Sequence, residues 1–206
     1  MERARMPHLP PGQRHPDWNQ VYESAAPESL PWHTSELDPD FRLELNFCGK
    51  KGMELLDVGC GLGYQADLIA KQGFAVTATD ISPAAIRRAR IHFPEVRFLV
   101  DDITRSRLNR SFDLTVDRGC FHVLGPSLHG SYCDAIQRLT KPRGIVLLKI
   151  LSSENPASDF GPLRFSLLGI HRLFGARFRV LRIRRTVYQG STPTPPKAWL
   201  VVLRNS

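Results

Sequence analysis

Closely spaced glycines at the end of a predicted strand are the first residues that could do chemistry. Residues 55–63 read LLDVGCGLG, which places Gly59, Gly61 and Gly63 directly before a helical pattern. Glycine has no Cβ, so a ligand can lie against the backbone of such a turn. In open α/β sheets this turn stands at the carboxyl edge, where ligands bind. The pattern therefore favours a ligand that contains a nucleoside.

An acidic residue, Asp80, ends the next predicted strand. A carboxylate at that place can accept hydrogen bonds from both hydroxyls of a ribose. The dinucleotide fingerprint G-x-G-x-x-G would start at Gly59 and Gly61, but its last position holds Tyr64. The residues thus favour a nucleoside ligand and disfavour a nicotinamide dinucleotide.

Cysteines and histidines are spread through the chain without the spacing of a metal site. The four cysteines form no CxxC pair, and the seven histidines form no HxH or HxxxH motif. We therefore expect no catalytic metal, no disulfide framework and a reducing compartment. Cys120 and His122 could form a thiol nucleophile with its base. No other protease-like feature accompanies them, so we expect Cys120 to be a packing residue.

The elements that would position these residues alternate between strand and helix. Short apolar runs predict strands over residues 54–58, 74–79, 96–100, 112–116 and 145–150. Helical spacing predicts helices over residues 62–70, 83–92 and 128–139, and Ser82 followed by Pro83 is a good start for the second of them. This order predicts an α/β fold with a doubly wound, mostly parallel sheet and helices on both faces.

The C-terminal part predicts one more helix, over residues 163–174, and two strands over residues 178–188 and 198–203. We expect these strands to form an antiparallel hairpin around a proline-rich loop. Phe178 and Val180 would share one face of the first strand, whereas Leu181 and Ile183 would share the other. A β-bulge would reconcile the two patterns.

The N-terminal part differs in composition from the rest of the chain. Four prolines and three arginines within residues 1–16 predict a mobile tail, so that residues 17–206 would form a single domain. Residues 17–47 look irregular, with a short helix expected from Pro39. We see no signal peptide, and the apolar run from Ile145 stops at Lys149. We therefore expect a cytoplasmic protein without a membrane span.

Taken in order, these motifs resemble those of the class I S-adenosylmethionine-dependent methyltransferases. That family has an acidic residue before G-x-G-x-G, an acidic residue after the second strand, and an acidic residue with its neighbour after the third. The matching positions are Asp57, Gly59, Gly61, Gly63, Asp80, Asp102 and Ile103. The resemblance covers roughly residues 50–150. It implies a Rossmann-like fold and S-adenosylmethionine as the cofactor.

Carried over position by position, the resemblance implies a cofactor site. Its residues would be Trp32, Asp57, Gly59, Cys60, Gly61, Gly63, Asp80, Ile81, Asp102, Ile103 and Asp117. Asp57 would favour the ammonium of the cofactor, Asp80 would hold the ribose diol, and Ile81 would lie against the adenine. Asp102 would accept from the adenine amino group, and the N–H of Ile103 would meet a ring nitrogen. The alternative for the carboxylates is an ordinary turn cap or a solvated loop.

The segment after the fourth predicted strand, residues 117–122, stands where family members close over the methionine and begin the acceptor pocket. Together with Trp18, Tyr22 and Trp32 it resembles the thiopurine and small-thiol methyltransferase branch, which uses an N-terminal lid. Residues 17–47 would be that lid, and the acceptor would be a small-molecule thiol. The tryptophans could instead be ordinary packing aromatics.

Two residues of this segment are candidate catalytic groups. A thiol has a reference pKa of about 8.5 and needs only a mild base or a nearby cation. His122 could take the proton of the acceptor. Arg118 could favour a thiolate or bind a substrate carboxylate. The alternative for His122 is a hydrogen-bonded structural histidine.

The formal charge of +8 is concentrated in the second half of the chain. Residues 101–206 carry 17 basic and 7 acidic side chains. Such a surface could attract RNA, an acidic protein or an anionic small molecule, although arginines that alternate with apolar residues favour a solvated face. An RNA or protein methyltransferase and a cofactor-binding scaffold without turnover therefore stay open as alternatives. A monomer with a small-molecule substrate is the expectation.

Overall fold

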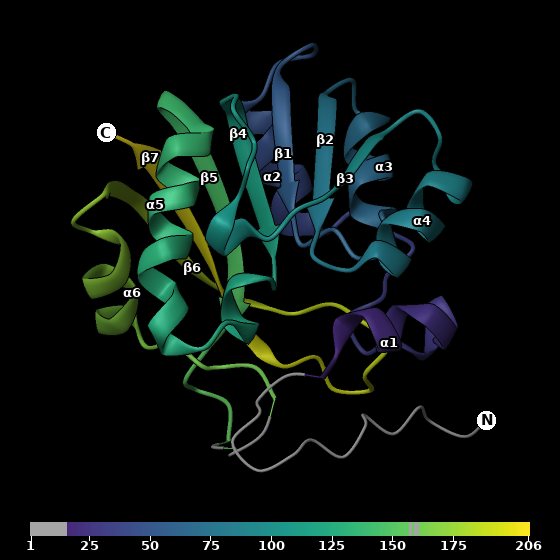
Figure 1. Ribbon diagram of the computed structural model, residues 1–206. Helices are drawn as coiled ribbons and strands as arrows, with labels where there is room; N and C mark the ends of the chain where they lie inside the picture. The colour runs from purple at the N-terminus through teal and green to yellow at the C-terminus, as the bar shows by residue number, and fades with distance from the viewer. Residues whose placement is uncertain (1–15, 157, 159–160) are drawn as a thin grey trace.

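The computed structural model describes residues 16–156, 158 and 161–206. Its sheet has seven strands (Figure 1). In spatial order they are β3 (Arg97–Val100), β2 (Ala75–Asp80), β1 (Glu54–Val58), β4 (Phe112–Arg118), β5 (Thr140–Leu151), β7 (Lys197–Asn205) and β6 (Phe178–Val187). The first five are parallel, and β7 pairs antiparallel with both β5 and β6. The predicted α/β fold, mostly parallel with a C-terminal antiparallel hairpin, is confirmed.

Helices cover both faces of the sheet. On one face lie α2 (Pro39–Cys48), α3 (Tyr64–Ala70) and α4 (Pro83–His92), and on the other lie α5 (His129–Leu139) and α6 (Leu167–Phe174). A further helix, α1 (Trp18–Ser24), belongs to neither layer and lies below the ends of β1 and β2 in Figure 1. Short 3₁₀ turns occur at η1 (Pro27–Ser29), η2 (Ile103–Arg105), η3 (Phe121–Val123) and η4 (Pro126–Leu128).

The interior strands are apolar on both sides because both faces of the sheet are buried. Leu55 and Leu56, neighbours on β1, point to opposite faces and pack in different core clusters. Trp199 and Leu200 on β7 divide in the same way. Both faces of the sheet are thus covered by packed side chains. A ligand would therefore bind at the ends of the strands.

The first strand of the C-terminal hairpin has the predicted irregularity. The register of β6 against β7 shifts between Val180 and Arg182, so the predicted bulge is confirmed. On the face toward α2, Arg182 pairs with Glu44 and Arg184 pairs with Asp40. Part of the positive charge of the C-terminal half is therefore neutralised within the fold.

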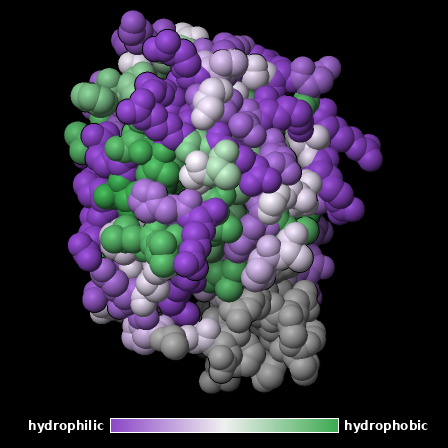
Figure 2. Space-filling view, turned by 90° about the vertical axis from the view of Figure 1, so that its left-hand side faces the viewer, coloured by the Kyte–Doolittle hydropathy of each residue, from purple (hydrophilic) through white to green (hydrophobic). Residues whose placement is uncertain are grey.

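The outer edge of the sheet is formed by β6. Figure 2, which views the side that lies at the left of Figure 1, shows apolar side chains gathered among charged ones. The exposed large apolar residues of α6 and β6 are Leu167, Leu168, Leu181 and Val187. Arginines on an edge strand, together with a bulge, discourage pairing with the edge of another sheet.

Three elements differ from their predicted extents by more than two residues. The helix α1 lies where the sequence looks irregular, because Asp17 caps it and tertiary packing rather than periodicity stabilises so short a helix. The strand β5 begins at Thr140, five residues before its predicted start. The helix α6 begins at Leu167, because Phe165 before it forms a bridge with Ser152 in extended conformation.

The N-terminal part is described from Pro16 onwards. The tail predicted over residues 1–16 therefore lies, except for Pro16, outside the described residues. Residues 17–47 contain α1, η1 and most of α2. In the described ranges no helix is long and apolar enough to span a bilayer.

Two phenylalanines of α2 test how this helix is held. Phe41 is fully buried, whereas Phe47 is 80% exposed. We predict that Phe41→Ala lowers the free energy of unfolding by about 3–5 kcal/mol, since it removes a buried ring and leaves a cavity. Phe47→Ala should change it by less than about 1 kcal/mol. Urea denaturation measures both values, and equal losses would contradict this packing of α2.

Candidate functional site

The glycine turn between β1 and α3 is held to the neighbouring strand through its backbone. The N–H groups of Gly59 and Cys60 donate to the carbonyl oxygen of Thr79 at 2.8 and 2.9 Å. The N–H of Gly61 donates to the carboxylate of Asp80 at 2.9 Å. Three consecutive N–H groups are thereby engaged, and the turn is fixed at the carboxyl edge of the sheet.

Each of the three glycines is required by its backbone conformation. Gly59, Gly61 and Gly63 have φ angles of 70°, 53° and 85°, in the left-handed region that other residues disfavour. Their surroundings add a steric reason. A Cβ on Gly61 would lie 2.8 Å from the hydroxyl of Tyr22, and one on Gly63 would lie 2.6 Å from the ring of Phe98. Substitution at these positions would therefore move the turn or its neighbours.

Asp80 stands at the end of β2, beside the glycine turn. One carboxylate oxygen accepts from the N–H of Gly61 and the other from the N–H of Ser82, each at 2.9 Å. Burial raises the pKa of Asp80 above its usual value. A carboxylate has about four acceptor positions, so each oxygen keeps one for a ligand. The carboxylate therefore has capacity for two further donors.

Asp57 on β1 is a buried carboxylate with an unused oxygen. The residue is 3% exposed, and its Oδ2 has no hydrogen-bond partner within the described part of the chain. Burial, together with the negative charges of Asp117 and Asp80, raises the pKa of Asp57 to about 7. An unpaired buried carboxylate is unfavourable unless something positive approaches it. The site therefore fits a ligand with an ammonium group next to Asp57.

Two cavities of the described structure lie along this edge of the sheet. The first, here called the glycine-loop cavity, is lined by Tyr22, Leu30, Trp32, His33, Thr34, Asp57, Gly59, Cys60, Gly61, Leu62, Tyr64, Gln65 and Arg118. The second, here called the β3-loop cavity, is lined by Ile81, Val100, Asp101, Asp102, Arg105 and Arg107. Asp80 connects the two, because it bonds to Gly61 in one and directly precedes Ile81 in the other. An elongated ligand could therefore occupy both cavities.

Three aromatic rings, here called the aromatic cover, close the glycine-loop cavity from the N-terminal side. Trp32 packs edge-on against Trp18 and Tyr22, with ring centroids 5.7 and 6.4 Å apart. The helix that carries two of these rings is fastened to α4, since the side-chain oxygen of Asn19 accepts from the N–H of Ala84 at 2.9 Å. The segment predicted to form a lid thus lies over the predicted glycine turn.

The loop after β3 engages most of its own polar groups. Asp102 accepts from the N–H of Thr104 at 3.0 Å and from the guanidinium of Arg105 at 3.1 and 3.2 Å. The Oδ2 of Asp101 is buried and has no partner within residues 16–156, 158 and 161–206. Of the two residues predicted here, Asp102 lines the β3-loop cavity, whereas the side chain of Ile103 packs in the core.

Asp117 at the end of β4 caps the turn that follows it. Its Oδ1 accepts from the N–H groups of Gly119 and Cys120, at 2.8 and 2.7 Å. Its Oδ2 accepts from the N–H of Phe121 at 2.9 Å and from the hydroxyl of Tyr132 at 2.6 Å. Burial raises its pKa to about 6. With four donors around it, the carboxylate shapes the turn and lines neither cavity.

His122 also lies outside both cavities. It is 6% exposed, and its Nδ1 accepts from the N–H of Leu151 at 3.3 Å. Burial, together with the positive charge of Arg118, lowers its pKa to about 3. Such an imidazole stays neutral and does not collect a proton near neutral pH. The geometry matches a structural histidine better than a base beside the acceptor.

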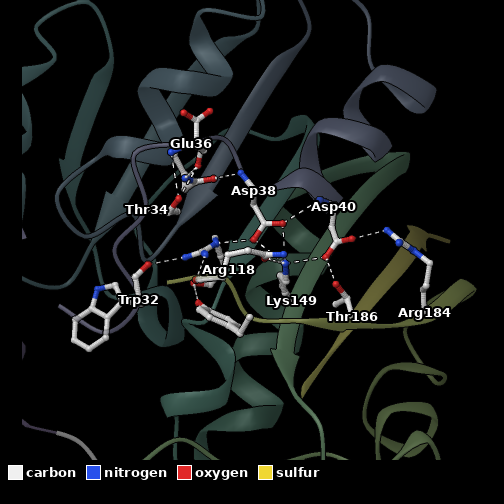
Figure 3. Close-up of polar contacts among 12 residues, drawn as sticks. Trp32, Thr34, Glu36, Asp38, Asp40, Arg118, Lys149, Arg184 and Thr186 are labelled. Carbon is white, nitrogen blue, oxygen red and sulfur yellow. Dashed lines mark hydrogen bonds and ion pairs between the residues drawn. The ribbon is translucent and has the colours of Figure 1, made fainter. Parts of the chain in front are cut away.

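Arg118 lines the glycine-loop cavity, but its guanidinium is already engaged. Its Nε donates to Asp38 at 2.8 Å, and its terminal nitrogens donate to the carbonyl oxygens of Trp32 and Gln189 at 2.9 and 2.5 Å (Figure 3). Its guanidinium carbon lies 4.6 Å from the centre of the Tyr188 ring. The side chain therefore connects separate segments with one N–H of each of its three nitrogens.

Several residues of the site were missed by the sequence analysis. They are Leu30, His33, Thr34, Leu62, Tyr64 and Gln65 in the cavity lining, and Asp38 and Lys149 behind it. A usable signal existed for Lys149, because it interrupts the apolar run of an interior strand, where a buried lysine needs a partner. A second signal was Asp38, which precedes Pro39 and caps α2. The lining residues themselves carry no local pattern that marks them.

The pKa of Asp57 provides a test of its surroundings. This pKa is about 7 in the folded protein and about 4 in an unfolded chain, so ionisation of Asp57 destabilises the fold as the pH rises from about 4 to 7. We predict that Asp57→Asn raises the Tm at about pH 8 and leaves it nearly unchanged at about pH 4. Asp134→Asn, at an exposed carboxylate, is the charge-matched control. A lower Tm for Asp57→Asn than for the wild type at the higher pH would contradict the prediction.

Part of the chain is similar to known sequences. Residues 55–144 match the family described as methyltransferase domain. The ubiquinone biosynthesis O-methyltransferase of Alkalilimnicola ehrlichii is 34% identical over 132 residues, which cover 61% of this chain and 50% of that protein. The chain spans half or less of the length of the first curated relatives that it matches.

Solved structures share the fold. A structure from work on the conversion of a disulfide bond into a thioacetal group during echinomycin biosynthesis has a TM-score of 0.77 and 25% identity, and the match covers 92% of both chains. The 1,6-didemethyltoxoflavin-N1-methyltransferase of Burkholderia thailandensis, with bound 1,6-didemethyltoxoflavin and S-adenosylhomocysteine, has a TM-score of 0.65 and 23% identity. That match covers 81% of this chain and 75% of the other, and at this identity it shows the fold alone. Residues 55–144 therefore resemble a methyltransferase domain in sequence, and the described chain shares the fold of these solved structures.

Proposed function

We propose that this protein transfers a methyl group from S-adenosylmethionine to a small-molecule acceptor, a thiol or a similarly soft nucleophile. One observation carries the proposal. The glycine-loop cavity combines an open glycine backbone, an unpartnered buried carboxylate and an aromatic cover. Among the described residues that line it, the carboxylate of Asp57 is assigned below to the ammonium of the cofactor, and burial lowers the pKa of His33. Such a cavity suits an acceptor that is already nucleophilic.

The edge of the sheet fits the cofactor along its length. The unpartnered Oδ2 of Asp57 would accept from the ammonium, and the glycine turn with Cys60 would lie against the methionine and the ribose. The free acceptor positions of Asp80 would take the ribose hydroxyls. The adenine would lie at Ile81. Around it would be Asp102, the backbone of Ile103 and the unpartnered Oδ2 of Asp101. The orphaned oxygens support this placement, because each is a buried acceptor in need of a donor.

Two predicted site residues receive a different role in this proposal. Asp117 would shape the turn that borders the methionine end, since four donors from the protein already surround it. His122 would hold that turn against β5 through its hydrogen bond to Leu151. Neither would touch the reacting atoms.

The chemistry asks for alignment and for exclusion of water. When bound, S-adenosylmethionine supplies a methyl group activated by a positively charged sulfur. The aromatic cover would exclude water from the cavity, and the glycine turn and Asp80 would fix the direction of approach. Arg118 would act on the acceptor through its charge, because its hydrogen bonds are used elsewhere. A thiol with a pKa of about 8.5 is partly ionised near neutral pH, and a nearby cation increases that fraction.

The relatives support a small acceptor, and one of them supports sulfur. The matched ubiquinone biosynthesis enzyme is an O-methyltransferase. The structural relative from echinomycin biosynthesis is linked to a reaction at a disulfide bond, and it matches this chain over 92% of its length. His33 lines the cavity, and burial lowers its pKa, which makes it a weaker base. A sulfur acceptor agrees with this, because a thiol needs only a mild base.

The two alternatives have weaker support. Methylation of RNA or an acidic protein would need free positive charge, yet seven arginines of the C-terminal half are paired with acidic side chains. They are Arg105, Arg110, Arg118, Arg177, Arg182, Arg184 and Arg185. A scaffold without turnover would bind the cofactor and transfer nothing, which a binding measurement combined with an acceptor screen distinguishes.

Turnover with a panel of small thiols of different pKa tests the acceptor class. With labelled cofactor we expect methylated thiol, at a rate whose pH dependence follows the pKa of each thiol rather than that of a histidine. His122→Asn should retain the rate within about threefold, because loss of a general base would cost about 100-fold or more. If the label appears in RNA or protein and no thiol is methylated, a thiol acceptor is refuted. A loss of 100-fold or more in His122→Asn, with the fold intact, would restore the catalytic role of that residue.

Asp80 provides the test of cofactor binding. Asp80→Asn should raise the Kd for S-adenosylhomocysteine by about tenfold or more, because an amide cannot accept from the turn and from both ribose hydroxyls at once. Asp67→Asn, at a carboxylate that pairs with Lys71 on α3, is the control and should leave the Kd within about twofold. Calorimetry measures both. Unchanged affinity in Asp80→Asn would contradict the assignment of this residue to the ribose.

A further inference from the structure

A buried cluster of charged side chains lies behind the glycine-loop cavity, and methyl transfer does not explain it. Lys149 of β5 has no exposed side-chain surface, and its Nζ lies 2.8 and 2.7 Å from the two carboxylate oxygens of Asp38 (Figure 3). The same nitrogen lies 2.8 Å from Asp40 and 2.6 Å from the side-chain oxygen of Gln189. Arg118 lies 2.8 Å from Asp38. Buried charges are unfavourable unless each is paired, so the cluster holds its members in one arrangement.

The sheet brings the two cations together. Arg118 and Lys149 are paired neighbours in the register of β4 and β5. Both reach the carboxylate of Asp38, whose side chain is fully buried. Since Asp38 belongs to the N-terminal part of the chain, its carboxylate connects that part to two adjacent strands.

Asp38 ends a segment, residues 30–38, that we call the roof segment. Its backbone N–H donates to the side chain of Gln65 in α3 at 2.8 Å, and Gln65 donates to the carbonyl oxygen of Glu36 at 2.9 Å. The end of the roof segment is therefore tied to the helix that follows the glycine turn. The roof segment also lines the glycine-loop cavity, with Leu30, Trp32, His33 and Thr34.

The other end of the roof segment is held by the C-terminal hairpin loop and by the same arginine. Ser191 donates to the carbonyl oxygens of Pro31 and Leu30, at 3.1 and 3.0 Å. Arg118 donates to the carbonyl oxygen of Trp32 at 2.9 Å. The roof segment is thus fastened at both ends, and Arg118 takes part at each of them.

We propose that Asp38, Lys149 and Gln189 are positioning residues that set, through Arg118, the place of the roof segment above the glycine turn. The inference rests on the proposed function, since it concerns the same cavity. Of the cluster, Arg118 is among the described residues that line the cavity. Asp38, Lys149 and Gln189 act through Arg118 and through the roof segment. Neutralising Asp38 leaves two cations without their shared carboxylate and frees the roof segment, although no group assigned to the cofactor is removed.

The test compares two equivalent changes in the full chain. Asp38→Asn replaces the shared carboxylate by an amide of the same shape. Glu44→Gln makes the same kind of replacement at a buried carboxylate of α2, whose partner is Arg182 and not the cluster. Calorimetry gives the affinity for S-adenosylhomocysteine well below the Tm of each variant. Hydrogen exchange without ligand reports on residues 30–38.

A positioning role and a merely stabilising role give different results. We expect Asp38→Asn to raise the Kd about tenfold, because a charge-assisted interaction that holds the roof segment is lost, and to speed exchange in the roof segment. Glu44→Gln should lower the Tm but keep the Kd within about twofold and leave exchange in the roof segment unchanged. A Kd and an exchange rate that are the same in Asp38→Asn and the wild type, or equal effects of the two variants, would overturn the proposal.

A second variant keeps the test decisive if Asp38→Asn does not fold. Asp38→Asn combined with Lys149→Gln preserves the net charge of the cluster, and the same loss of affinity and faster exchange in the roof segment are expected. An unchanged Kd and an unchanged exchange rate in this double variant would also overturn the proposal.

Failure of the proposed function is recognised separately. In that case the wild type does not bind S-adenosylhomocysteine, whereas exchange in the roof segment still reports on the network.

Discussion

The hydrogen bonds that fasten the glycine turn to β2 are the interaction on which the rest of the site depends. Thr79 and Asp80 accept from three consecutive N–H groups of the turn, so the shape of the turn and the orientation of Asp80 are set together. The parallel pairing of β1 with β2 makes this possible, because both strands end at the same edge. The unpartnered carboxylate of Asp57 lies on the first of these strands, and the aromatic cover closes over the turn. A change in this pairing would disturb every other part of the site.

Local pattern was sufficient for the features that depend on neighbouring residues. Glycine spacing and the acidic residues Asp57, Asp80 and Asp102 carried the resemblance to methyltransferases, and residues 55–144 match a methyltransferase domain. The alternation of strand and helix predicted the sheet. The bulge was predicted because Phe178 and Val180 conflict in phase with Leu181 and Ile183, and the register of β6 shifts at that place. Each of these signals is contained within a few consecutive residues, where backbone geometry fixes which side chains share a face.

Features that depend on distant residues could not be read in this way. The partners of Arg118 lie 71, 80 and 86 residues away in the chain, and Lys149 lies 111 residues from Asp38. The sequence shows that such side chains are charged, but it does not show which donors and acceptors will surround them. His122 is a candidate base by its place after the fourth strand, but the sequence does not show that its ring lies against the backbone of β5. The same limit applies to α1, which is too short to have a recognisable period.

The contact between Ser191 and Leu30 joins positions that are 161 residues apart. It is made by the loop before β7, a strand that inserts between β5 and β6. Contacts of such long sequence separation form late in folding, because the chain entropy of closing the loop must be overcome first. On the ribosome, the N-terminal segment emerges long before its C-terminal fastening exists. The segment above the glycine turn is therefore among the last parts of the fold to be fastened in the nascent chain.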